Sequence, residues 1–394
     1  MSLEIGFGER LTNIVSLTTA LTLLGKDANE ARSTARDLEE EIRTKATSTE
    51  EYHQNLEKAI FALQRAKDSL QQEQGDSVEE IEILNHEGPS FGSYQYATFH
   101  ADGLMSTVFK AEAKGNNAPV RIVALKVTHP SMMTPPHNSE REARLLVKAR
   151  SEHVVPLLET FHEPGGQFIL VFPFLRQDLE NLLRSRRLDA RQTAIIFEGL
   201  FKALEYIHSV GMIHRDVKPS NILLKTMYGP VYLADFGITW DPMDKDSEPA
   251  DAKITDVGTT CYRPPELLFG HRLYDASLDM WAAGCVVAEM IKDDHTPLFD
   301  AGALGSELSL IRSMFTTLGT PNDEVWPSAQ TYPDWGKMKF QPFPANPWKD
   351  LLPGASEKAV DLVSKTVCYE ATQRLTAKQA LEHEIRNNWN GPGD

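Results

Sequence analysis

The sequence has few cysteines, no proline in its first 88 residues and no long apolar run. The three cysteines, Cys261, Cys285 and Cys368, lie far apart without a Cys-x-x-Cys pair, so neither a disulfide framework nor a zinc site is expected. The apolar-leaning stretch 11–24 is too short to span a bilayer and lacks the cationic leader of a secretory signal. We therefore expect a cytoplasmic or nuclear protein that does not bind a membrane.

Positive charge is also scarce, because 40 lysines and arginines stand against 56 acidic residues and give a formal net charge of −16. A protein that coats nucleic acid needs a concentrated basic surface, so no nucleic-acid partner is expected. The length of 394 residues and the 41% hydrophobic content allow two or three domains with ample core. The composition is therefore compatible with an enzyme.

The first 75 residues are rich in helix-forming residues and contain two heptad seams. The first seam comprises Leu17, Leu21, Leu24, Ala28, Ala31, Ala35, Leu38 and Ile42. The second comprises Tyr52, Leu56, Ala59, Leu63, Ala66 and Leu70. This pattern predicts an antiparallel coiled-coil hairpin over 1–75, which either associates with a second copy or partner or packs on the domain that follows.

Loop signals and a run of acids over 76–93 predict a linker, and a second domain follows over 94–386. Short β-rich runs up to about residue 127 precede long helical periodicities beyond Glu140. Strands first and helices afterwards indicate an α+β domain with a small β-rich lobe and a larger helical lobe. The last residues, 387–394, are expected to form a flexible tail.

The densest chemical signal is the run His214-Arg215-Asp216-Val217-Lys218-Pro219-Ser220-Asn221, followed by Asp235-Phe236-Gly237. So many fixed residues seldom coincide by chance, and the second motif lies a short hairpin downstream. The two motifs resemble the catalytic loop and the magnesium loop of protein kinases. The resemblance covers about residues 94–384 and implies a bilobal kinase fold with serine/threonine kinase activity, using ATP and Mg²⁺.

The resemblance gives each of these residues a role. Asp216 would accept the proton of the substrate hydroxyl, and Lys218 would reach the γ-phosphate, as is typical of serine/threonine kinases. Asn221 and Asp235 would hold Mg²⁺, which prefers hard oxygen ligands. Thr259 lies in a run that resembles the end of an activation segment, and there it would hydrogen-bond Asp216 and Lys218.

The run 123–126 resembles the strand whose lysine, Lys126, binds the α/β-phosphates and needs a carboxylate partner on a nearby helix. The spacing from the glutamate to the paired leucines in the family that the sequence resembles favours Glu142 over Glu140, and Ser139 is expected to cap that helix. The resemblance assigns further positions to the nucleotide. These are Gly103 in the lid, Val108 and Ala124 on strands, Phe172, Pro173 and Leu175 in the hinge, Asp178 at the ribose, and the apolar Leu223 after the catalytic loop.

The lid departs from the family pattern. Where protein kinases have Gly-x-Gly-x-x-Gly, the sequence reads Ala-Asp-Gly-Leu-Met-Ser over 101–106 and keeps only the middle glycine. Glycine permits close approach of the backbone to phosphate, so this lid is expected to bind ATP less tightly. A pseudokinase scaffold is the alternative, but the complete set of catalytic residues favours an enzyme.

Further runs resemble the group that contains the cyclin-dependent kinases. These runs are 258–266, with Tyr-Arg before Pro-Pro-Glu, together with 318–321 and 373–377. Within this pattern Glu266 would pair with Arg374. Arg263 argues for a pocket that selects proline after the phosphorylated residue, and Gly258 among its altered neighbours argues against it, so an ordinary proline-directed kinase stays an alternative.

Two departures point to a branch within the group. The stretch 136–142 lacks the PSTAIRE-like signature that contacts cyclin, and Ile254 stands where the activating threonine is usual, with Thr255 beside it. With the altered lid, these features resemble the monomeric fungal kinases that phosphorylate cyclin-dependent kinases on their activation loops. The expected partner is therefore a cyclin-dependent kinase as protein substrate, with no cyclin required.

Overall fold

The computed structural model describes residues 88–113, 121–185, 187–302, 305–387 and 389. In the N-terminal part it describes residues 28–46 and the single positions 10, 13, 14, 17, 18, 21, 52 and 55. The chain divides into two compact units, Met1–Ile83 and Leu84–Asp394. Among the described residues no helix is both long and apolar enough to cross a membrane.

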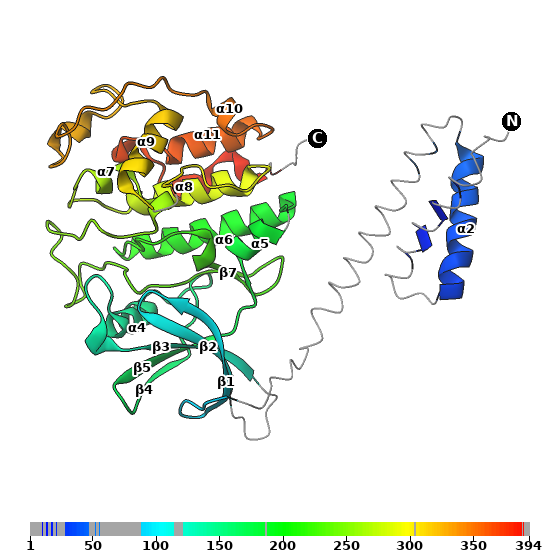
Figure 1. Cartoon of the computed structure of the whole chain (residues 1–394), viewed down its shortest axis with the longest axis horizontal. Coiled ribbons are helices and arrows are strands. Elements are labelled where there is room, and N and C mark those ends of the chain that lie inside the picture. Colours follow the sequence, from blue (N-terminus) through cyan, green and yellow to red (C-terminus); the bar gives the residue numbers. More distant parts are fainter. Residues whose placement is uncertain are drawn as a thin grey trace. The chain divides into compact units, whose positions relative to one another are not determined.

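The N-terminal unit contains helix α2 (Ala28–Lys45), drawn in blue in Figure 1. Five seam residues are buried together in a small hydrophobic core: Leu17, Leu21, Ala31, Ala35 and Ile42. On α2, Ala31, Ala35 and Ile42 are four and seven residues apart, which places them on one face of the helix. These first-seam residues are therefore buried together, whereas the coiled coil itself stays a prediction.

A buried polar cluster joins the same core. Arg10 Nε and Nη2 donate to the two carboxylate oxygens of Glu39 at 3.0 and 2.9 Å, and Tyr52 Oη donates to Glu39 Oε1 at 3.0 Å. Tyr52 is buried and is the first residue of the second seam. The other second-seam residues lie outside the described residues, so the hairpin stays a prediction.

The second unit begins with a five-stranded antiparallel sheet in the order β1-β2-β3-β5-β4 (Figure 1). Its strands are β1 (Tyr94–Gly103), β2 (Ser106–Ala113), β3 (Arg121–Thr128), β4 (Glu159–Glu163) and β5 (Gln167–Pro173). Val123, Leu125 and Val127 alternate along β3 and are buried in one cluster with Ile169 and Val171 of β5. This period of two places the neighbouring Lys126 on the opposite face.

Helix α4 (Ser139–Lys148) is the only long helix described in this β-rich lobe. Ser139 was expected to cap it, but the capping residue is Asn138, whose Oδ1 accepts a hydrogen bond from Arg141 N at 2.8 Å. Asn138 has the extended backbone of a cap, with φ −159° and ψ 105°, whereas Ser139 is already helical and its hydroxyl is buried. The expectation for Ser139 was therefore wrong by one position.

The larger lobe is helical (Figure 1). Its helices are α5 (Leu179–Ser185), α6 (Ala190–Ser209), α7 (Pro265–Leu268), α8 (Ser277–Ile291), α9 (Glu307–Leu318), α10 (Trp348–Leu351), α11 (Glu357–Thr366) and α12 (Ala377–Glu382). Nearly every residue of α8 is buried, as expected of a helix that is apolar all round. Trp389, within the expected tail, packs on Phe197 of α6 at a ring separation of 5.2 Å.

Short elements complete the second unit. A small sheet consists of β6 (Gln177–Asp178), β7 (Ile222–Leu224) and β8 (Val231–Leu233). The 3₁₀ helices are η1 (Pro130–Met132), η2 (Pro219–Asn221), η3 (Thr260–Tyr262), η4 (Pro327–Thr331), η5 (Ala371–Gln373) and η6 (Glu384–Asn387). The predicted α+β architecture of two lobes is confirmed.

Candidate active site

Lys126 lies between two carboxylates from different parts of the fold. Its Nζ is 2.7 and 2.9 Å from the two oxygens of Glu142 on α4 and 2.8 Å from Asp235 Oδ1. Burial alone lowers the pKa of the Lys126 ammonium, but the charges of Asp235 and Glu142 outweigh it and raise that pKa above its ordinary value. The ammonium in turn lowers the pKa of Asp235 well below its ordinary value. The expected pair with Glu142 is present, and Lys126 is a fixed cation.

Asp216 accepts hydrogen bonds at both carboxylate oxygens. Thr259 donates to Oδ1 through its N–H at 2.9 Å and its hydroxyl at 2.8 Å. Lys218 Nζ lies 2.9 Å from Oδ2 and also donates to the Thr259 hydroxyl at 2.8 Å. Asn221 Nδ2 donates to Oδ2 at 3.1 Å. The contacts expected from Thr259 are therefore present, and the carboxylate is held in one orientation.

The backbone around these groups is strained and held by a buried carboxylate. Arg215 has φ 74° and Asp235 has φ 63°, in the left-handed region that costs a residue other than glycine about 1–3 kcal/mol. Asp279 on α8 is fully buried, and its two oxygens accept the N–H groups of Arg215 and His214, each at 2.8 Å. Asp279 therefore fixes the loop that presents Asp216.

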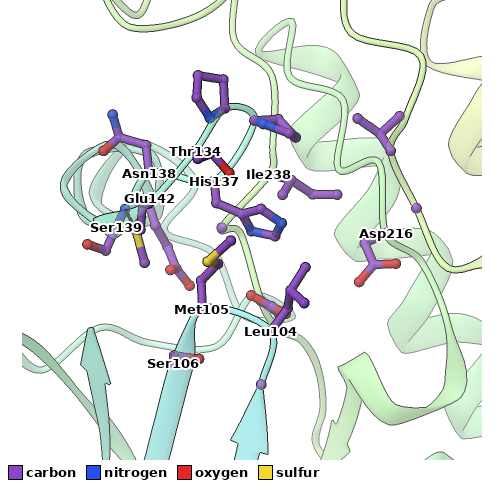
Figure 2. Close-up of a pocket in the computed structure, with 18 of the residues that line it drawn as sticks. Leu104, Met105, Ser106, Thr134, His137, Asn138, Ser139, Glu142, Asp216 and Ile238 are labelled. Atoms are coloured by element: carbon purple, nitrogen blue, oxygen red, sulfur yellow. Dashed lines mark hydrogen bonds between the residues drawn. The ribbon is translucent and has the colours of Figure 1, made fainter. Parts of the chain in front are cut away.

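A cavity of about 490 Å³ lies between the lobes (Figure 2). The expected site residues that line it are Gly103, Lys126, Glu142, Asp216, Lys218, Asp235 and Thr259. His137, which the sequence analysis did not single out, points into the same cavity near Leu104 and Ile238 in Figure 2. Burial lowers the pKa of His137, so its neutral form is favoured in the cavity.

The other expected nucleotide positions are not among the residues that line this cavity, and most of them lie on strands of the two sheets. Ala124 pairs with Phe172, and Val123 pairs with Pro173, where β5 leaves the sheet. Leu223 pairs with Asp178 in the small sheet, and Asp178 Oδ1 accepts the N–H of Asn181 at 2.8 Å. The remaining three expected positions in this part of the fold are Val108 on β2, Leu175 after β5 and Asn221 in η2.

The lid is the turn between β1 and β2. Gly103 pairs with Ser106, and Leu104 and Met105 form the tip. A Cβ on Gly103 would lie 2.8 Å from Ser106 Oγ, so a larger residue there would require the Ser106 side chain to move. Leu104 is 81% exposed at the mouth of the cavity. Apolar side chains therefore occupy the tip of the lid.

The residues present fit a nucleotide with a divalent cation. The amide nitrogen of Asn221 donates to the Asp216 carbonyl at 2.8 Å, which orients the amide oxygen as an acceptor. Asp235 is 46% exposed to the cavity and uses Oδ1 for Lys126. One carboxylate and one amide oxygen are the hard ligands that Mg²⁺ prefers alongside phosphate.

An ion pair far from the cavity holds the end of the segment that contains Thr259. Arg374 Nη1 and Nη2 donate to the two oxygens of Glu266 at 2.6 and 2.7 Å, and both side chains are buried. The expected pairing of Glu266 with Arg374 is therefore confirmed. A bidentate pair of this kind is among the stronger hydrogen-bonded contacts in proteins.

Comparison with known proteins agrees with this geometry. The family described as "Protein kinase domain" matches residues 101–385. The chain is 34% identical over 272 residues to Serine/threonine-protein kinase csk1 of Schizosaccharomyces pombe, which covers 68% of this chain and 86% of that protein. It is 33% identical to Cyclin-dependent kinase 20 of Danio rerio, over 72% of this chain and 80% of that protein. It is 32% identical to Cyclin-dependent kinase 7 of Xenopus laevis, over 76% and 82% respectively.

Proposed function

The chain belongs to the protein kinase family as a serine/threonine kinase of the cyclin-dependent kinase type, and from this premise we propose that its substrate is the activation loop of a cyclin-dependent kinase. The observation that carries the proposal is the contact of Lys126 Nζ with both Glu142 and Asp235 within a single chain. A kinase that activates cyclin-dependent kinases must itself work before any of them does. A catalytic arrangement completed without a second chain meets that need.

The residue roles follow from the contacts. The substrate hydroxyl loses its proton to Asp216 as its oxygen bonds to the γ-phosphorus and the bond to the β-phosphate oxygen breaks. Because Thr259, Lys218 and Asn221 already occupy the acceptor positions of Asp216, the hydroxyl enters in exchange for one of these donors. Asp216 therefore acts first by orienting the hydroxyl.

The cations of the site act on the phosphates. Lys126 binds the α/β-phosphates, and Lys218 reaches the γ-phosphate, where negative charge is spread in the transition state. Asn221 and Asp235 would hold Mg²⁺, which would neutralise part of the charge of the phosphates. Both lysines are fixed by carboxylates, so little reorganisation is needed during transfer.

The N-terminal unit is proposed to associate with a second copy of itself. Its described core consists of only a few small and apolar side chains around α2, and a short helical assembly of this size usually needs a further apolar surface. Static light scattering on the full chain should give a mass that rises to that of a dimer with concentration. A constant monomer mass would contradict this.

The experiment for the catalytic proposal is radiolabelled phosphate transfer from ATP and Mg²⁺ to an inactive cyclin-dependent kinase, with no cyclin added. We expect the label on the activation-loop threonine and at least about 10²-fold less with Asp216→Asn. Absence of label from that threonine, while a generic basic protein is phosphorylated, would contradict the substrate but not the kinase activity. Absence of all transfer with ATP still bound would support the pseudokinase scaffold.

One observation favours the proline-directed alternative. Gly258 has φ 80°, and its carbonyl accepts a hydrogen bond from Arg263 Nε at 2.9 Å. Arg263 therefore competes with a substrate N–H for this carbonyl, whereas proline has no N–H to place there. A peptide array tests this, because acceptance only of Ser-Pro and Thr-Pro peptides would overturn the activation-loop proposal.

A further inference from the structure

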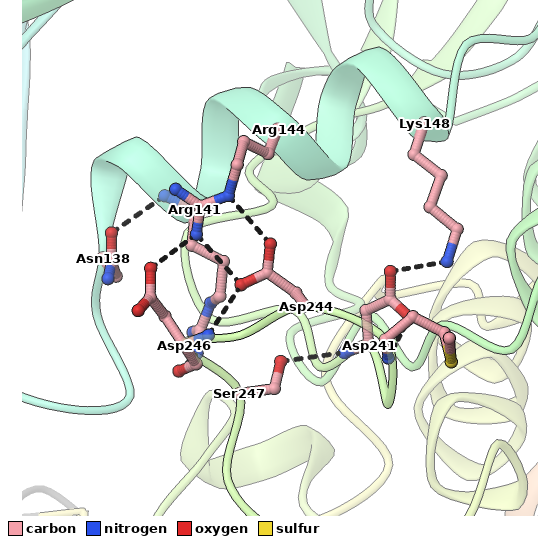
Figure 3. Close-up of polar contacts among 9 residues, drawn as sticks. Asn138, Arg141, Arg144, Lys148, Asp241, Asp244, Asp246 and Ser247 are labelled. Carbon is pink, nitrogen blue, oxygen red and sulfur yellow. Dashed lines mark hydrogen bonds and ion pairs between the residues drawn. The ribbon is translucent and has the colours of Figure 1, made fainter.

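Helix α4 presents three basic side chains to an acidic turn that follows the Asp235 loop. We call residues 241–248, which read Asp-Pro-Met-Asp-Lys-Asp-Ser-Glu, the acidic turn. Arg141, Arg144 and Lys148 are three, four and seven positions apart, so they share one face of the helix. Figure 3 shows this face lying over the acidic turn. The partners are more than 90 residues apart in the chain.

The contacts across this junction are charged and close. Arg144 Nε and Nη2 each lie 2.9 Å from an oxygen of Asp244, and Nη2 also lies 2.6 Å from Asp246 Oδ2. Lys148 Nζ lies 2.6 Å from Asp241 Oδ2. Hydrogen bonding to Asp244 raises the pKa of Arg144, and the same bond lowers the pKa of Asp244. Both partners therefore stay charged at neutral pH.

The acceptors are fixed by the turn itself. The N–H of Met243 donates to Asp241 Oδ1 at 3.0 Å, and the N–H of Asp246 donates to Asp244 Oδ1 at 3.0 Å. The Ser247 hydroxyl accepts the N–H of Asp241 at 3.3 Å (Figure 3). A surface ion pair is weak mainly because two flexible side chains must be ordered. Here the Asp244 and Asp241 side chains are nearly buried and already ordered.

The last residue of the turn reaches the catalytic loop. Glu248 accepts hydrogen bonds from Arg215 Nη1 at 2.9 Å and Nη2 at 3.4 Å, and the Arg215 side chain is fully buried. Arg141 Nη1 donates to the Asp246 carbonyl at 3.1 Å. A buried guanidinium without a carboxylate is costly, so Glu248 supplies a charge that Arg215 requires. Arg215 directly precedes Asp216.

The acidic turn therefore touches both parts of the site. Through Arg144 and Lys148 it holds the helix that carries Glu142, and through Arg215 it holds the loop that carries Asp216. A shift of α4 away from the turn would separate Glu142 from Lys126. We propose that the acidic turn keeps α4 and the catalytic loop in the catalytic arrangement, with Arg144, Asp244 and Glu248 as positioning residues for phosphate transfer.

This inference concerns the kinase activity itself and holds for whichever protein accepts the phosphate. It is tested with the full chain, ATP and a generic basic protein as substrate. Arg144→Gln and Asp244→Asn remove one charge each; the asparagine has nearly the same size as Asp244, and the glutamine is shorter than Arg144 but stays polar. Each should lower kcat about 10-fold or more, and the double variant should have about the same kcat as Arg144→Gln alone, because the Arg144–Asp244 contact is already lost in that single variant. If the two single-variant decreases in kcat multiply in the double variant, the proposal is wrong.

A charge exchange gives the second measurement. Arg144→Asp alone should lower kcat by about 10-fold or more, and adding Asp244→Arg should restore most of it. Hydrogen exchange should increase over 139–148 in each single variant and not in α8. Loss of activity without restoration, or with unchanged exchange over 139–148, would contradict a positioning role. If the double variant with Arg144→Asp and Asp244→Arg does not fold, Arg144→Gln and Asp244→Asn still test the proposal.

The matched control is another arginine in an ion pair. Arg184 Nη2 lies 2.6 Å from Glu180 Oε1 on α5, away from the cavity. Arg184→Gln should leave kcat and the KM for ATP within about 2-fold of the original chain. Glu248→Gln should lower kcat without raising the KM for ATP, because it acts on the Asp216 loop. If Arg184→Gln lowers kcat as much as Arg144→Gln does, the effect is general and the proposal fails.

Discussion

Replacing Glu289 by glutamine should change how the stability of this kinase depends on pH. Glu289 lies on α8, is 6% exposed, and accepts a hydrogen bond from the Tyr262 hydroxyl at 2.7 Å. Burial raises the pKa of its carboxyl to about 7 from an ordinary value of 4.5. The folded chain therefore keeps a proton on Glu289 at a pH where the unfolded chain has lost it.

The sign follows from this difference in bound protons. Between pH 4.5 and about 7 folding takes up a proton at Glu289, so the stabilising contribution present at low pH is lost as the pH rises. The difference between the two pKa values corresponds to about 3 kcal/mol. Glutamine stays neutral and can still accept the Tyr262 hydrogen bond. Glu289→Gln should therefore gain up to about 3 kcal/mol over the original chain between pH 5 and pH 8.

The assay is urea unfolding, followed by tryptophan fluorescence, of both chains at pH 5, 6, 7 and 8. The difference in free energy of unfolding should grow with pH and level off above pH 7. The exposed residue Glu324 provides the control variant Glu324→Gln, which should show no such growth. A difference that is constant across the four pH values would refute the reasoning, because the carboxyl would then not carry the proton.

Three further substitutions test other parts of the fold. Asp216→Asn should lower phosphate transfer at least about 10²-fold with ATP binding retained; equal loss of nucleotide binding in a titration would argue against its role as base. Arg374→Met leaves the Glu266 carboxylate buried without a partner and should cost about 3–5 kcal/mol in urea unfolding; a cost below about 1 kcal/mol would contradict this. Gly284→Ala places a Cβ 2.7 Å from Val367 Cγ2 and should destabilise by about 1–3 kcal/mol; an unchanged thermal midpoint would show that α8 and α11 can separate.

The sequence predicts well those parts of the site whose functional residues lie close together in the chain. The catalytic loop and the Asp235 loop are contiguous motifs, and Lys218 and Asn221 lie within the same run as Asp216. Thr259 contacts Asp216 from a separate motif far downstream in the chain. The family spacing between the glutamate and the paired leucines favours Glu142 over Glu140, and Glu142 is the residue that contacts Lys126. The cap was misplaced because Asn138 and Ser139 are both good capping residues. Only the backbone conformation decides between them.

The acidic turn shows what sequence alone does not predict. A run of aspartates after the Asp235 loop has no apolar period and is most simply interpreted as a solvated loop. Its meaning depends on Arg144 and Lys148, which are about 100 residues earlier and are ordinary surface residues of an amphipathic helix. The contact exists because the two lobes bring α4 and the turn together, and no local rule encodes that approach.

We expect the altered lid and the residues inside the cavity, Lys126, Asp216 and Lys218, to act on different kinetic constants. Lid glycines help the backbone to approach the phosphates in the bound ground state, and here Leu104 and Met105 occupy that tip. Lys126, Asp216 and Lys218 act where charge develops during transfer, and their contacts are intact. An interaction lost equally from ground state and transition state raises KM and leaves kcat unchanged. We therefore expect a change in the lid to alter the KM for ATP, and a change at Lys126, Asp216 or Lys218 to alter kcat.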